Sequence, residues 1–127
     1  MQIFDLIGRI LISLVFLLAG AGKIFNYEGT INYMESFSVS SYLLIPAIII
    51  EILFPLLIII GYKTRLSALI LALFSLLLAV IFHSDFSDQM QLISFLKNFA
   101  IAGGFLILFV NGPSLWSLDR VLSSKTK

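Results

Sequence analysis

Long runs of apolar residues, separated by short polar segments, make up most of this chain. A helix needs about 20 apolar residues to cross the hydrocarbon core of a bilayer, and four runs come close to that length. No run alternates apolar and polar residues with a period of two, which argues against strands. The predicted spans are residues 3–25, 42–61, 66–83 and 92–110. The pattern therefore predicts an all-α integral membrane four-helix bundle, with the whole chain, 1–127, forming one domain.

The polar segments differ in character. Residues 26–41 are long enough to include a short amphipathic helix between the first two spans. Residues 61–65 form a tight turn in which Thr64 is the expected N-cap of the third span. A Gly-Pro break at 112–113 ends the fourth span, and the tail beyond it mixes apolar with polar residues. The apolar residues expected on a short interfacial C-terminal helix are Leu115, Trp116, Leu118 and Leu122.

Composition supports a membrane protein. Hydrophobic residues make up 60% of the chain and charged residues 12%, with a mean hydropathy of +1.09. Soluble domains have about 45–50% apolar and about 25% charged residues. A net charge of +1 without a basic cluster gives no reason to expect a nucleic-acid partner. The absence of cysteine excludes disulfides and thiolate ligands, and a single histidine is too little for a metal site, so we expect no bound metal.

The distribution of basic residues predicts the orientation. Four spans put both termini and the middle turn on one side of the membrane. Six of the eight Lys and Arg residues fall on that side, and the other side has only Lys23 and Lys97. The positive-inside rule therefore predicts that both termini are cytoplasmic. The six residues are Arg9, Lys63, Arg65, Arg120, Lys125 and Lys127.

An acidic residue, Glu51, stands alone in the middle of the second predicted span. It lies about nine residues into the span, about 13 Å deep at the helical rise, which is close to the bilayer midplane. An ionised carboxylate is costly at that depth, so it must face the bundle and find a partner. Pro55 follows one turn later and cannot donate a hydrogen bond to the carbonyl of Glu51. We therefore expect an inward-facing polar notch at Glu51.

The first span presents one helical face to the bundle, because five residues recur at spacings of three and four. On the cytoplasmic side, we expect Arg9 on this face to pair with Asp119, although the sequence leaves open whether Arg9 or Lys97 pairs with Glu51. The five residues of the face are Arg9, Ser13, Phe16, Gly20 and Lys23.

Polar residues from three other span ends fall at the outer side of the bundle. Lys23 closes the first span, His83 ends the third, and Lys97 and Asn98 open the fourth. Together with Glu51 they predict a pocket that opens to the exterior and has the carboxylate as its floor. Simpler roles stay open, since lysines near helix ends can extend to the interface and a histidine can cap a helix C-terminus. Glu51 itself can serve as a purely structural ion-pair residue.

Several short motifs, in order along nearly the whole chain, resemble the DoxX family of small bacterial membrane proteins. Each motif alone is weak, but their order and spacing together are fairly specific. The first span has the motif residues Arg9, Phe16, Gly20 and Lys23, and the second has the intramembrane acid Glu51. The later motif residues are Gly61, Thr64, Arg65, His83, Lys97, Asn98, Ala100, Gly103, Gly104, Gly112, Pro113, Ser117 and Asp119.

The resemblance implies a four-helix bundle in the bacterial inner membrane. Members of this family are linked to quinone-dependent oxidation of sulfur compounds, to membrane oxidoreductase complexes that handle oxidative stress, and to tolerance of quinones and catechols. Related eukaryotic four-helix proteins are assembly chaperones. No haem, flavin or iron–sulfur motif is visible in this sequence. The resemblance therefore suggests an accessory role beside an oxidoreductase, or a subunit without a redox cofactor of its own.

Two functions follow as hypotheses. In the first, Phe16 helps to form an apolar slot for a quinone, four polar groups bind its carbonyls, and Glu51 donates or accepts a proton. The four polar groups are those of Lys23, His83, Lys97 and Asn98. The expected partners are lipids, a quinone, and a membrane oxidoreductase or further copies of the chain. In the second, the bundle is a non-enzymatic scaffold or assembly factor, and Glu51 only fixes the packing.

Overall fold

The computed structural model describes residues 2–114 and 116–126, with side chains described through residue 123. This part of the chain is helical, and four of its helices are long and apolar enough to cross a membrane, which confirms the predicted class. The spans agree with the predicted ones to within a few residues. The elements are α1 (Gln2–Phe25), α2 (Tyr27–Ser36), the 3-10 helix η1 (Ser41–Leu43), α3 (Leu44–Ile60), α4 (Thr64–Phe82), α5 (Gln89–Asn111) and α6 (Leu118–Thr126).

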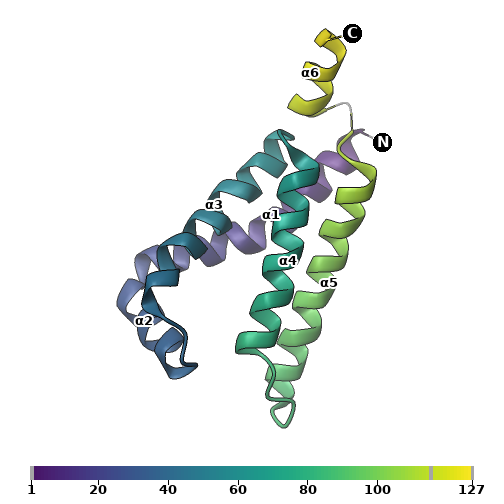
Figure 1. Ribbon diagram of the computed structural model, residues 1–127. Helices are drawn as coiled ribbons and strands as arrows, with labels where there is room; N and C mark the ends of the chain where they lie inside the picture. The colour runs from purple at the N-terminus through teal and green to yellow at the C-terminus, as the bar shows by residue number, and fades with distance from the viewer. Residues whose placement is uncertain (1, 115, 127) are drawn as a thin grey trace.

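The four long helices pack as two pairs. Helix α1 packs along α3, and α4 packs along α5 (Figure 1). The pairs come together at the end where a short turn joins α3 to α4, and they diverge toward the end that carries α2. Both termini lie at the first of these ends, as four spans require. The bundle therefore has a closed end near the termini and a wider end near α2.

Glycines and side-chain caps end or begin the helices at the turns. Gly61 has φ 81° and ends α3, where its N–H donates to the carbonyl of Leu57. A φ in this range favours glycine, because other residues meet a steric penalty there. At the start of α5, the side chain of Asp88 accepts a 3.0 Å hydrogen bond from the N–H of Met90.

The predicted N-cap of α4 is wrong. Thr64 is the first helical residue, and the preceding residue, Lys63, makes no side-chain cap. The N–H groups of Lys63 and Thr64 instead donate to the carboxylate of Asp119, at 2.7 and 2.8 Å. The start of α4 is thus capped by a residue that lies 55 positions away in sequence.

The core follows the predicted inward face of α1. Arg9, Ser13, Phe16 and Gly20 are all buried. The ring of Phe16 lies 5.8 Å from that of Phe105, between centroids, which ties α1 to α5. The buried apolar cluster around this pair consists of Phe16, Ile58, Ala68, Leu71, Ala72, Ala102 and Phe105.

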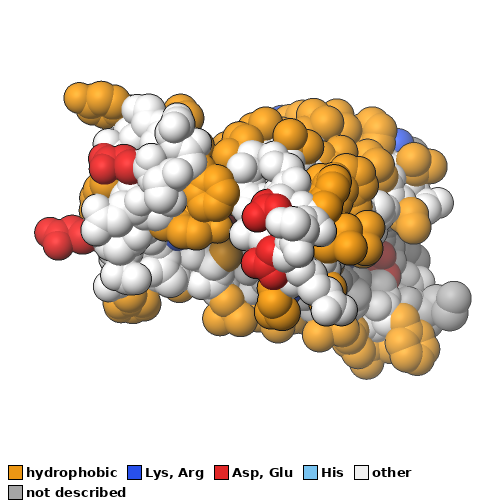
Figure 2. Space-filling model, turned by 90° about the horizontal axis from the view of Figure 1, so that it is seen from below, with side chains coloured by type: hydrophobic (Ala, Val, Ile, Leu, Met, Phe, Trp, Pro, Cys, Tyr) orange, Lys and Arg blue, Asp and Glu red, His pale blue; other side chains and the backbone are white. Residues whose placement is uncertain are grey.

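Large apolar side chains cover the outside of the bundle. Leu18 on α1 and Ile107 on α5, for example, are 70% and 65% exposed. Figure 2 shows hydrophobic side chains around the perimeter of the molecule when it is viewed from the end that carries α2. A surface of this kind suits a hydrocarbon solvent and would be unfavourable in water.

The C-terminal helix exists as predicted, since α6 begins at Leu118 and stands beyond the end of the bundle (Figure 1). Trp116 and Leu122 have exposed side chains. Leu115 lies outside the described residues. The interfacial position of α6 stays a prediction.

Candidate functional site

The carboxylate of Glu51 lies inside the bundle and meets a lysine from another helix. Its side chain is 1% exposed. The Nζ atom of Lys23, near the end of α1, donates a 3.0 Å hydrogen bond to Oε1 and lies 2.9 Å from Oε2. Oε2 has no hydrogen-bond donor with good geometry in the described part of the chain. The partner of Glu51 is therefore Lys23, and neither Arg9 nor Lys97.

A glycine on α1 allows this close approach. A Cβ atom placed on Gly20 would lie 2.7 Å from Cδ1 of Ile52 and 3.2 Å from Cβ of Glu51. Pro55, one turn beyond Glu51, is buried and has no N–H to donate to the carbonyl of Glu51. The carboxylate thus sits where α1 and α3 are in close contact and where the helical hydrogen bonding of α3 is interrupted.

A cavity of about 600 Å³ opens beside the ion pair and is lined by residues from α1, α2, α3, α4 and α5. The sequence hypothesis named six residues for one pocket, and all six line this cavity. These residues are Phe16, Lys23, Glu51, His83, Lys97 and Asn98.

The polar groups of this cavity differ in how firmly they are held. His83 Nδ1 lies 3.2 Å from Oε1 of Gln91, within hydrogen-bonding distance. The backbone carbonyl of Asn98 accepts a 2.8 Å hydrogen bond from Ser75, which fixes α5 against α4 at this level. Lys97 makes no hydrogen bond or ion pair with the described residues. Lys97 is therefore the cation best able to meet a ligand.

Three polar residues in the lining were missed by the sequence analysis. Asn26, Thr30 and Tyr33 come from α2 and the residue before it. The 26–41 segment was expected to include a short amphipathic helix, and none of its polar side chains was named for the pocket. The spacing of Asn26, Thr30 and Tyr33, by four and three, was the available signal for a common face.

A second, apolar cavity of about 240 Å³ adjoins the first. The two share Lys23, Glu51, Met34, Leu78 and Phe82. Every other side chain in the lining of the second cavity is apolar, and most come from α3 and α4. The ion pair therefore lies at the boundary between a cavity that contains several polar side chains and one that is otherwise apolar.

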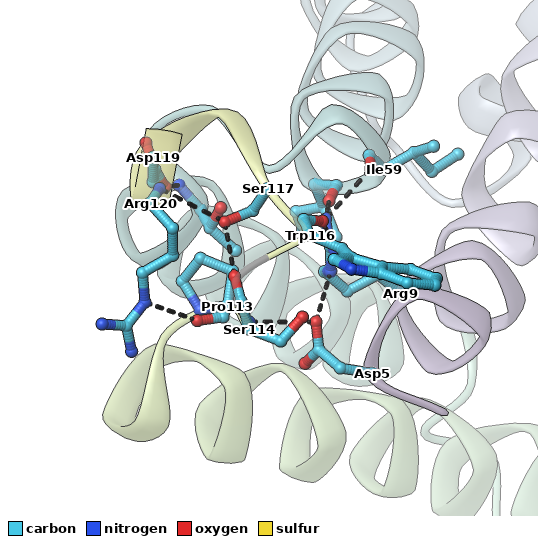
Figure 3. A network of polar contacts seen from close by, with 11 residues as sticks. Asp5, Arg9, Ile59, Pro113, Ser114, Trp116, Ser117, Asp119 and Arg120 are labelled. Carbon is cyan, nitrogen blue, oxygen red and sulfur yellow. Dashed lines mark hydrogen bonds and ion pairs between the residues drawn. The ribbon is translucent and has the colours of Figure 1, made fainter. Parts of the chain in front are cut away.

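The predicted ion pair between Arg9 and Asp119 is wrong. The guanidinium of Arg9 is buried and pairs with Asp5, one turn earlier on α1, at 2.8 Å (Figure 3). The carboxylate of Asp119 accepts from backbone N–H groups at the start of α4. The sequence spacing of four between Asp5 and Arg9 was the overlooked signal.

Arg9 also forms hydrogen bonds with two other segments of the chain. It donates 3.0 Å hydrogen bonds to the carbonyls of Ile58 and Ile59, near the end of α3, and another to the carbonyl of Trp116. Carbonyls in the last turn of a helix have no partner within that helix, so a buried guanidinium satisfies them. Arg9 thus has a structural role at the closed end of the bundle, far along α1 from the Lys23–Glu51 pair.

These features define a class of protein: an integral membrane four-helix bundle with an internal acid–base pair beside a cavity. The chain belongs to the DoxX family, since the family model described as DoxX matches residues 4–84. That match includes Lys23, Glu51 and His83.

Two curated relatives extend over most of the chain. The protein named "Inner membrane protein YqjF" of Escherichia coli (strain K12) is 43% identical over 120 residues, which are 94% of this chain and 92% of the relative. "Inner membrane protein YphA" of the same strain is 37% identical over 122 residues, which are 91% and 87% of the two chains. No solved structure matches this chain. The chain is thus a DoxX-family inner membrane protein.

Proposed function

We propose that this protein binds a quinone-type ligand in the two adjoining cavities and acts as a quinone-linked accessory component of a membrane oxidoreductase or oxidative-stress system. The observation that carries the proposal is the position of the Lys23–Glu51 pair, where a cavity with several polar side chains meets one that is otherwise apolar. Quinones have the same division, with a polar head of carbonyl groups and an apolar tail. The family resemblance points to the same ligand class.

The larger cavity offers donors for the quinone carbonyls. Lys97, without a partner in the described chain, supplies a charged donor, and the side chains of His83 and Asn98 lie in the same lining. The apolar cavity between α3 and α4 would take the start of the tail. Hydrogen bonds from a charged group contribute about 1.5–3 kcal/mol each, so one missing donor should be measurable as weaker binding.

Glu51 is suited to proton exchange with such a ligand. Reduction of a quinone to a quinol takes up two electrons and two protons. In this proposal the electrons come from a partner oxidoreductase, and the Lys23–Glu51 pair passes one proton to a ligand oxygen. The second proton comes from water at the open side of the cavity, which also reprotonates the pair. The chain itself supplies one proton and the hydrogen-bond donors that bind the ligand.

Calorimetric titration of the purified protein with a short-chain ubiquinone or menaquinone analogue tests the proposal. We expect Lys97→Ala to weaken binding about tenfold, as the loss of one charged hydrogen bond implies. Lys63→Ala removes a lysine at the other end of the bundle and is the matched control, with unchanged affinity expected. Equal affinity for the parent, Glu51→Gln and Lys97→Ala would show that the cavity is not the binding site.

A structural role for the ion pair is the second candidate, because the pair joins α1 to α3 and fixes how they pack. In that case the protein is a scaffold or assembly factor. The double variant Lys23→Glu with Glu51→Lys separates the two. If the protein is a scaffold, the swapped variant should be as thermally stable as the parent, and neither of the two should bind quinone. A quinone-binding protein should bind in the parent form and lose affinity in the swapped form.

A further inference from the structure

Three cationic side chains line one cavity at the closed end of the bundle, opposite to the proposed quinone site. Lys63, Arg65 and Arg120 contribute to a space of about 410 Å³ between the start of α4, the turn after α5, and α6. The other lining residues include Thr64, Gly112 and Asp119. The cavity thus joins segments that are far apart in sequence and concentrates positive charge between them.

The acidic residue in this lining, Asp119, already accepts two hydrogen bonds. Both carboxylate oxygens of Asp119 accept backbone N–H groups, at 2.7 and 2.8 Å. None of the three cations forms an ion pair within residues 2–114 and 116–123. The cavity therefore contains three positive charges against the single negative charge of Asp119.

The two guanidinium groups lie close to the backbone after α5. A Cβ atom built on Gly112 would lie 2.9 Å from Nε, 3.2 Å from Nη2 and 3.4 Å from Cζ of Arg65, so the group packs where a side chain would otherwise stand. Arg120 donates through Nε to the carbonyl of Pro113 at 3.0 Å, and Figure 3 shows its outer nitrogens pointing away from this network. Both groups keep donors for a further acceptor.

The start of α4 adds a second kind of observation. Thr64 is fully buried and lines the cavity, and its hydroxyl has no hydrogen-bond partner in the described structure. The positive end of the helix dipole lies at the same place, and α4 has 19 residues. Asp119 already takes the N–H groups of Lys63 and Thr64, so the donors left for an oxyanion beside this helix N-terminus are the hydroxyl of Thr64 and the three cations.

We propose that this cavity binds the phosphate group of an anionic membrane phospholipid. Phosphate oxygens match the paired donors of a guanidinium, and basic pockets between transmembrane helices bind lipid head groups. Leu66 on α4 lines the cavity and has an exposed side chain, so acyl chains can continue from there along the bundle. A soluble phosphate has the same head chemistry, but it would gain nothing from this apolar side chain.

Lipid binding to the protein in an uncharged detergent, followed by native mass spectrometry, tests the proposal. The probes are phosphatidylglycerol, zwitterionic phosphatidylcholine of the same chains, and inorganic phosphate. We expect phosphatidylglycerol to bind at least tenfold more tightly than phosphatidylcholine, with little competition from millimolar phosphate. Equal binding of the two lipids overturns the proposal. Full displacement by phosphate overturns the lipid assignment, because it shows that the acyl chains contribute nothing.

Variants locate the site. Arg65→Gln should lower the affinity for phosphatidylglycerol several-fold, and the double variant Arg65→Gln/Arg120→Gln should lower it at least tenfold. Lys97→Gln, at the other end of the bundle, is the matched control and should bind like the parent. Arg120 also has a structural hydrogen bond, so thermal unfolding is measured first, and Arg65→Gln alone decides if the double variant is unstable. Parent-like binding by Arg65→Gln overturns the assignment of this cavity.

Discussion

The ammonium group of Lys23 lies against both carboxylate oxygens of Glu51, 3.0 Å from Oε1 and 2.9 Å from Oε2, and so joins the end of α1 to the middle of α3. The two partners differ in exposure, since the side chain of Lys23 is 26% exposed and that of Glu51 only 1%. The lysine is thus the member of the pair that solvent or a ligand can reach, while the acid depends on the lysine for its charge balance.

Removal of the lysine should destabilise the bundle more than removal of an unpaired one. Lys23→Met leaves Glu51 buried without a counter-ion, and we expect a loss of about 3 kcal/mol, near the lower end for a broken buried pair. Lys97→Met, a control without an ion pair in the described chain, should change stability by no more than about 0.5 kcal/mol. Unfolding in detergent, followed by circular dichroism, measures both. Equal effects of the two substitutions would show that the Lys23–Glu51 pair contributes no special stability.

The contact between α1 and α3 should depend on Gly20. An added methyl group would lie 2.7 Å from Cδ1 of Ile52 and 3.2 Å from Cβ of Glu51, so Gly20→Ala should cost about 1–3 kcal/mol. Gly22→Ala is the matched control on the same helix, because nothing lies within 4 Å of a Cβ atom there. That control should be neutral or stabilising by up to about 1 kcal/mol. The same unfolding measurement applies, and a Gly20→Ala variant as stable as Gly22→Ala contradicts the close approach.

The remote cap on α4 should be measurable as a loss of stability. Asp119→Ala removes the acceptor for the N–H groups of Lys63 and Thr64, and loss of a helix N-cap costs about 1–2 kcal/mol. Glu35→Ala removes an exposed acid from α2 and should have almost no effect. Hydrogen–deuterium exchange should show faster exchange in the first turn of α4 in the Asp119→Ala variant. Unchanged exchange there would mean that another group caps the helix.

The membrane orientation can be tested by labelling single introduced cysteines, because the chain has no cysteine of its own to give background labelling. The positive-inside rule predicts cytoplasmic termini, so a cysteine placed by Glu28→Cys on α2 should react with a membrane-impermeant maleimide in intact spheroplasts. Ser123→Cys on α6 should react only after the membrane is permeabilised. The opposite pattern of labelling would reverse the predicted topology.

The sequence predicted the features that depend on a local pattern alone. Four apolar runs predicted the spans, and a lone acid in the second run identified Glu51 as the residue that must face inward. The choice of Lys23 over Arg9 as its partner depends on how α1 crosses α3, which Gly20 permits by close packing. The spacing of residues along the sequence does not reveal how these two helices cross.

The closed end of the bundle shows the same division. Arg9 was paired with Asp119 because both were expected on the cytoplasmic side, yet the nearer Asp5 at a helical spacing of four takes that place. Asp119 caps a helix that starts 55 residues earlier, a contact that arises only when the tail folds back over the turn after α3. Local spacing could have predicted the first contact, whereas the second is a product of tertiary folding.

Photoaffinity labelling with an azido-quinone tests the central claim most directly. The protein in membranes is irradiated with the probe, digested, and the labelled peptides are identified by mass spectrometry. The account predicts label on the segments that line the two cavities, around Lys23 and Phe82, with competition by unlabelled quinone and a reduced yield in Lys97→Ala. Label spread over the lipid-facing surface of the helices, without competition by unlabelled quinone, would contradict it.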